Sequence, residues 1–379
     1  YRVVGYFSTY NIYERGYLVT DIPGQLLTHV NYGPMNISTN GQCISADQWA
    51  DTQYSYPGDE TAERLRGNVK QLRLLRGDYP GLQVILSIGG WDYSSRFSDV
   101  ALTAESRRRF ALSCVALMRQ YDFDGIDIDW RYPVEGGLLS SEREEDRQNL
   151  TLLLEELRAQ LDTAGTDDEQ TYLLTLTAPA AEAFYRHYEL QNVHLSLDWI
   201  NITSYGYQGA WSELASHHAP LFSNTLDSRG EEMQTQYNVA ASVDAYLDAG
   251  VPASKIVVGI PFFAQTWRNV RAGDLFGLYQ PASGVPTGTR DGGLLYYRDL
   301  QPLLESDSYT RYFDNETRAT WLYNAATRIA VSYDDQESIA YKTAYVRSAG
   351  LGGVFAWELS YDDEQNSLLG AVRSGLSLR

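Results

Sequence analysis

Eight short apolar runs alternate along the chain with longer segments of helical periodicity, and this alternation limits the possible folds more than any other feature. The runs are rich in β-branched and aromatic residues, as buried strands are. Segments 104–121 and 146–164 lie between them, the second with leucines at helical spacing. Eight successive βα units predict an α/β fold, the (β/α)8 TIM barrel. The predicted strands are 3–7, 27–32, 83–88, 123–128, 172–176, 199–203, 256–261 and 353–357.

An insertion is predicted between strands seven and eight, because about 90 residues separate them and one crossover helix needs far fewer. Its sequence contains short β-like pieces and one helical stretch, typical of a small α+β unit. We therefore expect barrel strands one to seven in 1–267, the insertion in 268–335, and strand eight with a final helix in 336–379. The β-like pieces are 293–297, 320–323 and 328–333, and the helical stretch is 297–305.

Charge and aromatic content restrict the class of ligand. The net charge of −19 argues against nucleic acid and against an anionic membrane surface, since both require basic patches. No apolar segment reaches the 18 or more residues expected of a membrane span. The 29 tyrosines and 8 tryptophans suit stacking on sugar rings, although most of them are expected in the core. A neutral ligand fits this composition best.

The start of the chain and the two cysteines give little information on cellular location and on disulfide bonding. No basic-then-apolar leader opens the chain, and Tyr1 runs directly into the first predicted strand, which suits a trimmed start. A secreted or extracellular location is the expectation. Cys43 and Cys114 are either two buried thiols or one bridge, and the sequence leaves both open.

The end of the fourth predicted strand carries a row of charged residues. Segment 124–133 reads Asp-Gly-Ile-Asp-Ile-Asp-Trp-Arg-Tyr-Pro. Alternate residues of a strand share a face, so Asp127, Asp129 and Arg131 are expected in one row, about 7 Å between neighbours. In a TIM barrel, chemistry is placed at the carboxyl ends of the strands. We therefore predict the functional site there.

Three further strand ends complete a family pattern. Strand three ends in Ser-Ile-Gly-Gly-Trp (87–91), strand six in Asn-Ile-Thr-Ser-Tyr-Gly-Tyr-Gln-Gly-Ala-Trp (201–211), and strand eight in Gly-Gly-Val-Phe-Ala-Trp-Glu (352–358). Together with Tyr-Asp-Asp-Gln-Glu-Ser-Ile (333–339) and the charged row, they make nearly the whole chain resemble glycoside hydrolase family 18, the chitinases and their relatives. The family pattern for the charged row is Asp-Gly-x-Asp-x-Asp-Trp-Glu-Tyr-Pro, so Arg131 stands where that pattern has glutamate.

The resemblance implies substrate-assisted hydrolysis of N-acetylglucosamine polymers such as chitin, outside the usual two-carboxylate scheme. The glutamate is the family's general acid, the position of Asp129 orients the substrate acetamide, and that of Tyr205 binds the acetamide carbonyl. A general acid must release its proton near neutral pH. The guanidinium of Arg131 stays protonated and donates hydrogen bonds only. We expect it to pair with Asp129 or Asp127.

Other positions depart from the family pattern as well. On strand six the pattern Met-Thr-Tyr-Asp-x-His-Gly is matched by Thr-Ser-Tyr-Gly-Tyr-Gln-Gly, which puts Gly206 in place of the second acidic residue. On strand seven the pattern Pro-Phe-Tyr-Gly-Arg becomes Pro-Phe-Phe-Ala-Gln, with Phe263 and Gln265. Several polar losses around one sugar position favour a natural chitinase-like protein that binds chitin or N-acetylglucosamine oligomers without cleaving them.

Aromatic residues at the strand ends are the expected sugar contacts. Family resemblance implies that Trp357 forms the floor of the cleft beneath the sugar nearest the cleavage point. Each tryptophan alone could equally belong to the core, but three at matched positions favour sugar binding. The predicted substrate-binding residues are Tyr6, Phe7, Trp91, Tyr132, Trp211, Phe263 and Trp357.

Two alternatives stay open. A working chitinase could take its acid from elsewhere, for example Glu182 after strand five or Glu213 after strand six. A protein-interaction scaffold could have closed the groove and use its acidic surface to meet a protein partner.

No metal or cofactor is predicted. His217 and His218 are adjacent, so they face apart on any regular element. His29, His187 and His194 lack the spacing of metal ligands. No phosphate-binding glycine loop follows a strand.

Overall fold

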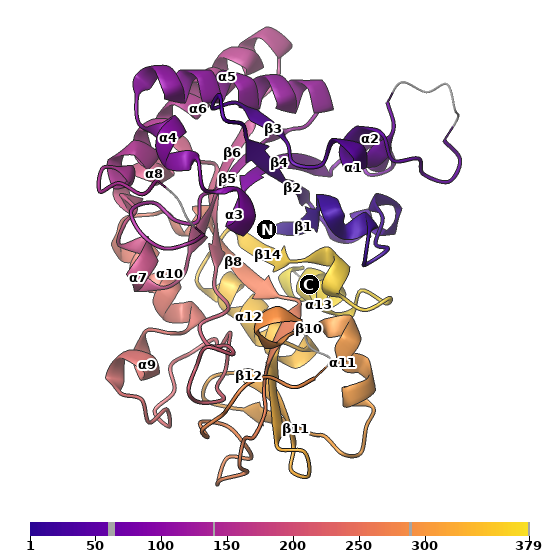
Figure 1. The fold of residues 1–379 in the computed structure, drawn as a ribbon, viewed down its shortest axis with the longest axis vertical. Coiled ribbons are helices and arrows are strands. Elements are labelled where there is room, and N and C mark those ends of the chain that lie inside the picture. The colour runs from indigo at the N-terminus through magenta and orange to yellow at the C-terminus, as the bar shows by residue number, and fades with distance from the viewer. Residues whose placement is uncertain (60–64, 139–140, 288–289, 378–379) are drawn as a thin grey trace.

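The computed structural model describes residues 1–59, 65–138, 141–287 and 290–377 and contains a closed barrel of eight parallel strands (Figure 1). The strand order is β1-β14-β8-β7-β6-β5-β4-β2, and pairing of β1 with β2 closes the ring. The predicted TIM barrel is therefore confirmed, and each of the eight predicted runs overlaps one of its strands. The bounds are β1 Arg2–Ser8, β2 His29–Ile37, β4 Gln83–Gly89, β5 Gly125–Asp129, β6 Leu173–Pro179, β7 Trp199–Thr203, β8 Ile256–Pro261 and β14 Gly353–Trp357, with β3 Cys43–Ser45 antiparallel to β2.

Helices surround the barrel, and the longest, α6, lies beside α5 at the top of Figure 1. The α-helices are α1 Gln48–Thr52, α2 Gly67–Asp78, α3 Gly90–Tyr93, α4 Phe97–Ala101, α5 Ala104–Tyr121, α6 Asp146–Asp168, α7 Glu182–Tyr185, α8 Leu190–Ser196, α9 Glu231–Thr235, α10 Val239–Asp248, α11 Tyr297–Leu304, α12 Gln336–Ser348 and α13 Ser367–Leu376. Short 3-10 helices are η1 Thr9–Ile12, η2 Val19–Asp21, η3 Gly24–Leu26, η4 Ala253–Lys255, η5 Asp291–Gly293 and η6 Leu359–Tyr361. No helix in these ranges is both long and apolar enough to cross a bilayer.

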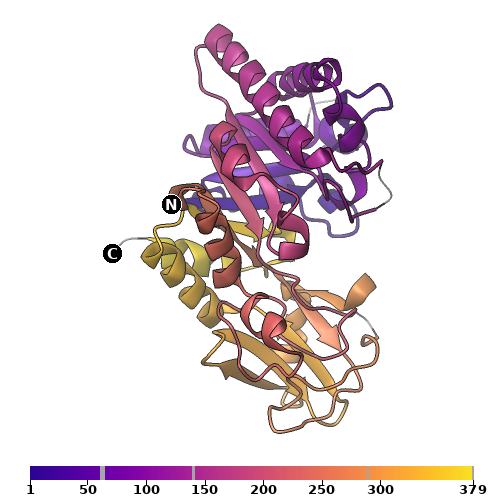
Figure 2. The ribbon, with the colours of Figure 1, turned by 90° about the vertical axis from the view of Figure 1, so that its left-hand side faces the viewer.

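A second, antiparallel sheet lies below the barrel (Figure 2), in the order β10-β9-β13-β12-β11. Its strands are β9 Phe263–Trp267, β10 Leu294–Tyr296, β11 Thr310–Asp314, β12 Ala319–Asn324 and β13 Ile329–Tyr333. The expected α+β insertion thus has the predicted kinds of elements. Its first strand, β9, precedes the predicted boundary at 267, because the chain leaves the barrel directly after β8. The division into 1–267, 268–335 and 336–379 stays a prediction.

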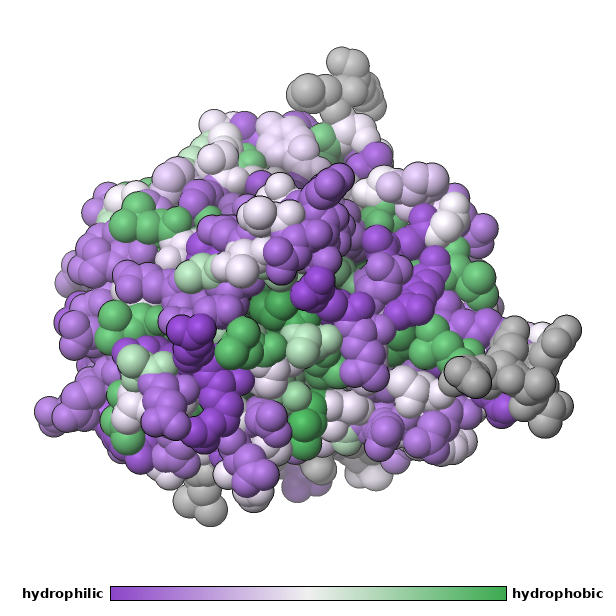
Figure 3. Space-filling model, turned by 90° about the horizontal axis from the view of Figure 1, so that it is seen from above, coloured by the Kyte–Doolittle hydropathy of each residue, from purple (hydrophilic) through white to green (hydrophobic). Residues whose placement is uncertain are grey.

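The apolar residues form one large core between the barrel and its helices and two smaller cores. The core inside the barrel contains Val4, Tyr6, Ile85, Trp199, Val257 and Phe355. Cys43 and Cys114 are both buried free thiols, so of the two possibilities left open by the sequence the structure has the unbridged one. The face seen from above is mostly hydrophilic, with hydrophobic residues in small groups (Figure 3).

Candidate functional site

Strand β5 carries the first two members of the charged row, Asp127 and Asp129, and Arg131 follows its end. Asp127 and Asp129 are 0% and 1% exposed, and both lie on its inner face. Asp124 lies before the strand, where its carboxylate accepts hydrogen bonds from Arg76 at 2.9 Å and from the backbone N–H of Val84 at 2.7 Å. Asp124 therefore anchors the N-terminal end of β5. The carboxylates of Asp127 and Asp129 are left for the site.

Hydroxyl groups from the neighbouring strands surround Asp127. Its carboxylate accepts hydrogen bonds from Ser87 at 2.9 Å, from Thr175 at 2.6 Å and from Thr177 at 3.0 Å. Burial raises the pKa of Asp127 to about 6, with the bond from Thr175 opposing this and the charge of Asp129 adding to it. The environment of Asp127 thus favours the protonated form more than water does.

Arg131 binds Asp129 through two parallel hydrogen bonds. Nε donates to Oδ1 at 2.7 Å and Nη2 donates to Oδ2 at 2.9 Å, a bidentate pair. Burial of Arg131 opposes its charge, but Asp129 outweighs this and raises the pKa of Arg131 well above its usual value. Ser94 holds the backbone here, donating to the carbonyl of Asp129 at 3.1 Å and accepting from the N–H of Arg131 at 2.9 Å. The predicted pairing of Arg131 with Asp129 is present.

The guanidinium of Arg131 also lies over an aromatic ring. Its central carbon is 5.6 Å from the ring centroid of Trp357, the residue expected to form the floor of the cleft. The ring of Tyr6 is 4.5 Å from that of Trp357, tilted by 41°. The half-buried indole of Trp357 is therefore in contact with two side chains of this protein.

Next to Arg131, a cavity of about 440 Å³ is lined in part by Tyr132 and Tyr205, and we call it the aromatic cavity. Tyr205 lines this cavity, and its hydroxyl is buried and has no hydrogen-bond partner among the described residues. Burial raises the pKa of Tyr205, so the phenol stays protonated and is a donor. The cavity is lined by Trp91, Tyr132, Gly137, Pro179, Ala180, Ala181, Ala183, Phe184, Thr203, Tyr205, Gly206, Tyr207, Trp211 and Tyr237.

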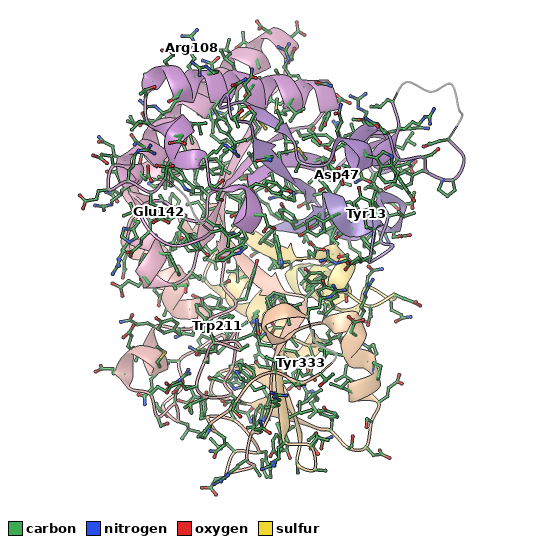
Figure 4. All side chains as sticks on the ribbon, viewed as in Figure 1. Tyr13, Asp47, Arg108, Glu142, Trp211 and Tyr333 are labelled. Carbon is green, nitrogen blue, oxygen red and sulfur yellow. The ribbon has the colours of Figure 1, made fainter. Side chains whose placement is uncertain are left out.

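The predicted aromatic contacts separate into two groups. Trp91, Tyr132 and Trp211 line the aromatic cavity, and Trp91 and Trp211 are 48% and 66% exposed. Figure 4 shows Trp211 where the loop after β7 passes between the barrel and the smaller sheet. Phe263 and Tyr6 are buried behind the surface, with Phe263 edge-on to the ring of Tyr205 at 5.7 Å. Their roles in substrate binding stay predictions.

Phe7 does not face the site, which corrects the expectation that it lines the mouth. It is fully buried in the core between barrel and helices, 6.0 Å from the ring of Tyr17 and 6.1 Å from that of Tyr32. Tyr6 belongs to the core inside the barrel. Because neighbouring residues of a strand point to opposite faces, Phe7 points out of the barrel toward the helices.

Three aromatic residues that line the cavity, Phe184, Tyr207 and Tyr237, are not among the predicted site residues. Phe184, in the short helix α7, stacks on Tyr132 with ring centroids 4.3 Å apart, and Tyr237 follows α9. Both belong to segments between predicted strands, and neither closes a strand. The sequence Ala-Phe-Tyr at 183–185, just after β6, the fifth predicted strand, is the signal that could have indicated Phe184.

A buried ion pair fixes the loop that follows Trp357. Arg15 forms an ion pair with the buried carboxylate of Glu358 and donates to the hydroxyls of Tyr296 at 2.9 Å and Tyr361 at 3.1 Å. This cluster joins the loop after β1, the smaller sheet and the end of β14. Sequence patterns do not reveal it because its members are some 280 to 350 positions apart.

The two glutamates considered as substitute acids are both exposed. Glu182 begins α7 and Glu213 lies in the loop after β7, and neither is among the described residues that line the aromatic cavity. The neighbours of Glu182, Ala181 and Ala183, do line it. The geometry thus brings together Asp127, Asp129, Arg131 and Tyr205, without either glutamate.

Comparisons with known proteins agree with the barrel fold. The sequence model for Glycosyl hydrolases family 18 matches residues 2–362. Chitinase A1 of Niallia circulans is 39% identical over 413 residues, and the match covers 99% of this chain but only 59% of that relative. The structure of chitinase ChiA74 from Bacillus thuringiensis has a TM-score of 0.93 at 33% identity, with 99% of this chain and 69% of that chain covered. A mutant class V chitinase from Nicotiana tobaccum, solved in complex with NAG4, has a TM-score of 0.84 at 25% identity, with 100% and 99% covered.

Proposed function

The chain belongs to glycosyl hydrolase family 18, and from this membership we propose that it binds chitin or N-acetylglucosamine oligomers in its barrel groove without hydrolysing them. Relatives that are chitinases support the ligand class, and one was solved with NAG4. The tryptophans and tyrosines of the aromatic cavity support it physically, because flat aromatic faces stack on the apolar faces of sugar rings.

The observation that carries the absence of hydrolysis is the two-bond pair between Arg131 and Asp129. Asp129 has both carboxylate oxygens engaged by the guanidinium, at the position that the family uses to orient the acetamide. Arg131, at the position of the family's general acid, holds its proton throughout the working pH range. Loss of a positioned acid lowers a rate by about 10² to 10⁴, and a cation beside a developing oxocarbenium ion lowers it further.

Calorimetry and a reducing-end assay test this proposal together. Titration with chitin oligomers of four to six units should give binding heat at up to millimolar ligand, while the same oligomers stay intact on prolonged incubation. Absence of heat would contradict the binding, and released reducing ends would contradict the absence of hydrolysis. Trp211→Ala is the matched control for binding through the cavity, because the side chain is largely exposed and its loss leaves the core intact.

An active chitinase is the second candidate, favoured by the chitinase relatives. The motif resemblance, which implies catalytic roles for the positions of Asp129 and Tyr205, supports it too. In that case the acid comes from another side chain, and Glu182 beside the cavity wall is the first to test. Activity of the unmodified chain that Glu182→Gln abolishes, with Glu213→Gln as the companion variant, would establish this function.

A further inference from the structure

We propose that Cys43 and Cys114 are a cross-linking site, at which a small-molecule disulfide such as oxidised glutathione converts the two buried thiols into one internal disulfide. The bond fastens strand β3 to helix α5 on the outside of the barrel. Neither cysteine lines the aromatic cavity or touches the pair of Arg131 and Asp129 among the described contacts, so the cross-link does not depend on the ligand of the groove.

The two cysteines come from elements that pack on each other. Cys43 begins β3, the three-residue strand at the edge of the sheet, and Cys114 lies within α5, the helix in contact with β3 (Figure 1). The backbone N–H of Cys43 donates to Oγ of Ser113 at 2.8 Å, and Ser113 is the residue before Cys114. This hydrogen bond holds the backbone of Cys43 against the turn of helix that carries Cys114.

The two thiols are in contact with each other. Burial raises the pKa of the Cys114 thiol well above its usual value, and a hydrogen bond with the Cys43 thiol raises it further. A disulfide forms without a large backbone movement only where the two side chains already point toward each other. The chain has two cysteines, so each is the only internal partner of the other.

Cys43 is the thiol that meets the oxidant. It is 5% exposed, whereas Cys114 is 0% exposed, and a short edge strand can open locally. The thiolate of Cys43 attacks one sulfur of the oxidant, whose other half leaves as a thiol. The thiolate of Cys114 then attacks the sulfur of Cys43 and releases the second half. One S–S bond breaks in the oxidant and one forms in the protein, and the two cysteine protons end on the released thiols.

The cross-link restrains a long part of the chain. The segment from Cys43 to Cys114 contains strand β4 and helices α1 to α4. A disulfide that closes a long segment reduces the freedom of the unfolded chain, and the unfolding equilibrium constant should therefore fall by roughly 10². The bridged form is expected in an oxidising compartment, and the form with two thiols in a reducing one.

Refolding in a glutathione buffer tests the site at equilibrium. The chain is unfolded in urea and refolded with reduced and oxidised glutathione, and its thiols are then counted in fresh denaturant. We expect a monomer without reactive thiols, with a mass lower by two hydrogen atoms and a pair of tryptic peptides joined through Cys43 and Cys114. A folded chain that keeps both thiols, or that carries glutathione on one of them, would overturn the inference. If refolding is inefficient, prolonged incubation of the folded chain with oxidised glutathione decides, by the same outcomes.

Cys114→Ser is the matched control, because it removes one sulfur and keeps Cys43. Oxidation should raise the urea midpoint of the unmodified chain, and dithiothreitol should reverse the rise. Oxidised and reduced preparations of the variant should unfold alike, and an equal rise in the variant would mean that oxidation acts elsewhere and would overturn the assignment. If the variant does not fold, the thiol count and the peptide map of the unmodified chain decide alone. Oligomer binding by the cross-linked chain tests the proposed function separately, because the two results are independent.

Discussion

The side chains of Arg131 and Asp129 are joined by two hydrogen bonds at the mouth of the barrel, 2.7 Å and 2.9 Å long, on one face of β5 and its continuation. Each group satisfies the other in a place that water hardly reaches. The pair therefore sets the charge of the site and the stability of the strand end, and it gives the sharpest experimental test of both.

Arg131→Ala should destabilise the fold. Removing one member of a buried ion pair leaves the other charge uncompensated, which costs about 3–5 kcal/mol. Because Arg131 is partly exposed, we expect a loss near the lower end of this range, about 3 kcal/mol. Urea denaturation at pH 7 measures the change. Arg109→Ala, which removes an exposed pair with Glu105, should change the free energy of unfolding by less than about 0.5 kcal/mol. Equal losses in the two variants would contradict this assignment.

Hydrolysis should appear when the acid is restored. Arg131→Glu combined with Gly206→Asp places a carboxyl beside Asp129, and the like charge raises the pKa of one member so that it can donate a proton near neutral pH. A Cβ at Gly206 meets no described atom within 4 Å, although its φ of +70° costs an aspartate about 1 kcal/mol.

Release from a fluorogenic chitobioside measures the gain, which we expect to reach about 10² over the unmodified chain. Arg131→Gln with Gly206→Asp is the matched control, since an amide transfers no proton. A double variant that binds the oligomer yet shows no turnover would mean that the acid is not the only missing group.

More of the fold than of the candidate site could be predicted from the sequence. All eight barrel strands were recognisable because each is a separate apolar run, and the row from Asp127 to Arg131 follows from the two-residue period of a strand. The same period, applied strictly, would have excluded Phe7. Phe184 and Tyr237 were missed because their places depend on how loops fold over the barrel, and local patterns contain no such information. The contact between Arg15 and Glu358 likewise depends on tertiary structure alone.

Stability should fall as the pH rises from about 4 to about 6 because of Asp127. Burial raises the folded-state pKa of this carboxyl from 3.8 to about 6, so the folded state binds more protons than the unfolded state between these values. The stabilising contribution of protonated Asp127 is fully present below its pKa in the unfolded state. It is lost as the pH rises through its pKa in the folded state. Its total is about 3 kcal/mol, at 1.36 kcal/mol for each tenfold difference in proton affinity.

Comparison with Asp127→Asn isolates this effect from other acidic groups. Urea midpoints from pH 4 to pH 8 should show the unmodified chain losing stability relative to the variant up to about pH 6, with a constant difference above it. A difference that is independent of pH across the whole range would contradict the raised pKa of Asp127.

Trp211→Ala should weaken oligomer binding and leave stability unchanged. The ring is 66% exposed, so its removal creates no cavity, and the free energy of unfolding should change by less than about 0.5 kcal/mol. One lost stacking contact corresponds to about 1 kcal/mol, a roughly fivefold rise in the dissociation constant of the chitin tetramer. Leu195→Ala, at an apolar side chain that is 71% exposed outside the cavity, is the control and should leave binding unchanged.

Tyr205→Phe should change stability and binding in opposite directions. The hydroxyl of Tyr205 is buried and has no partner in the described part of the chain, and a buried polar group without a hydrogen bond costs about 1–3 kcal/mol. Its removal keeps the ring and the edge-on contact with Phe263, so the free protein should become more stable by about 1 kcal/mol. The oligomer loses a hydrogen-bond donor, so the dissociation constant should rise about fivefold or more. Thermal unfolding and calorimetry on the same preparation measure both, and a variant that loses stability and binds normally would show that the hydroxyl serves the fold and not the ligand.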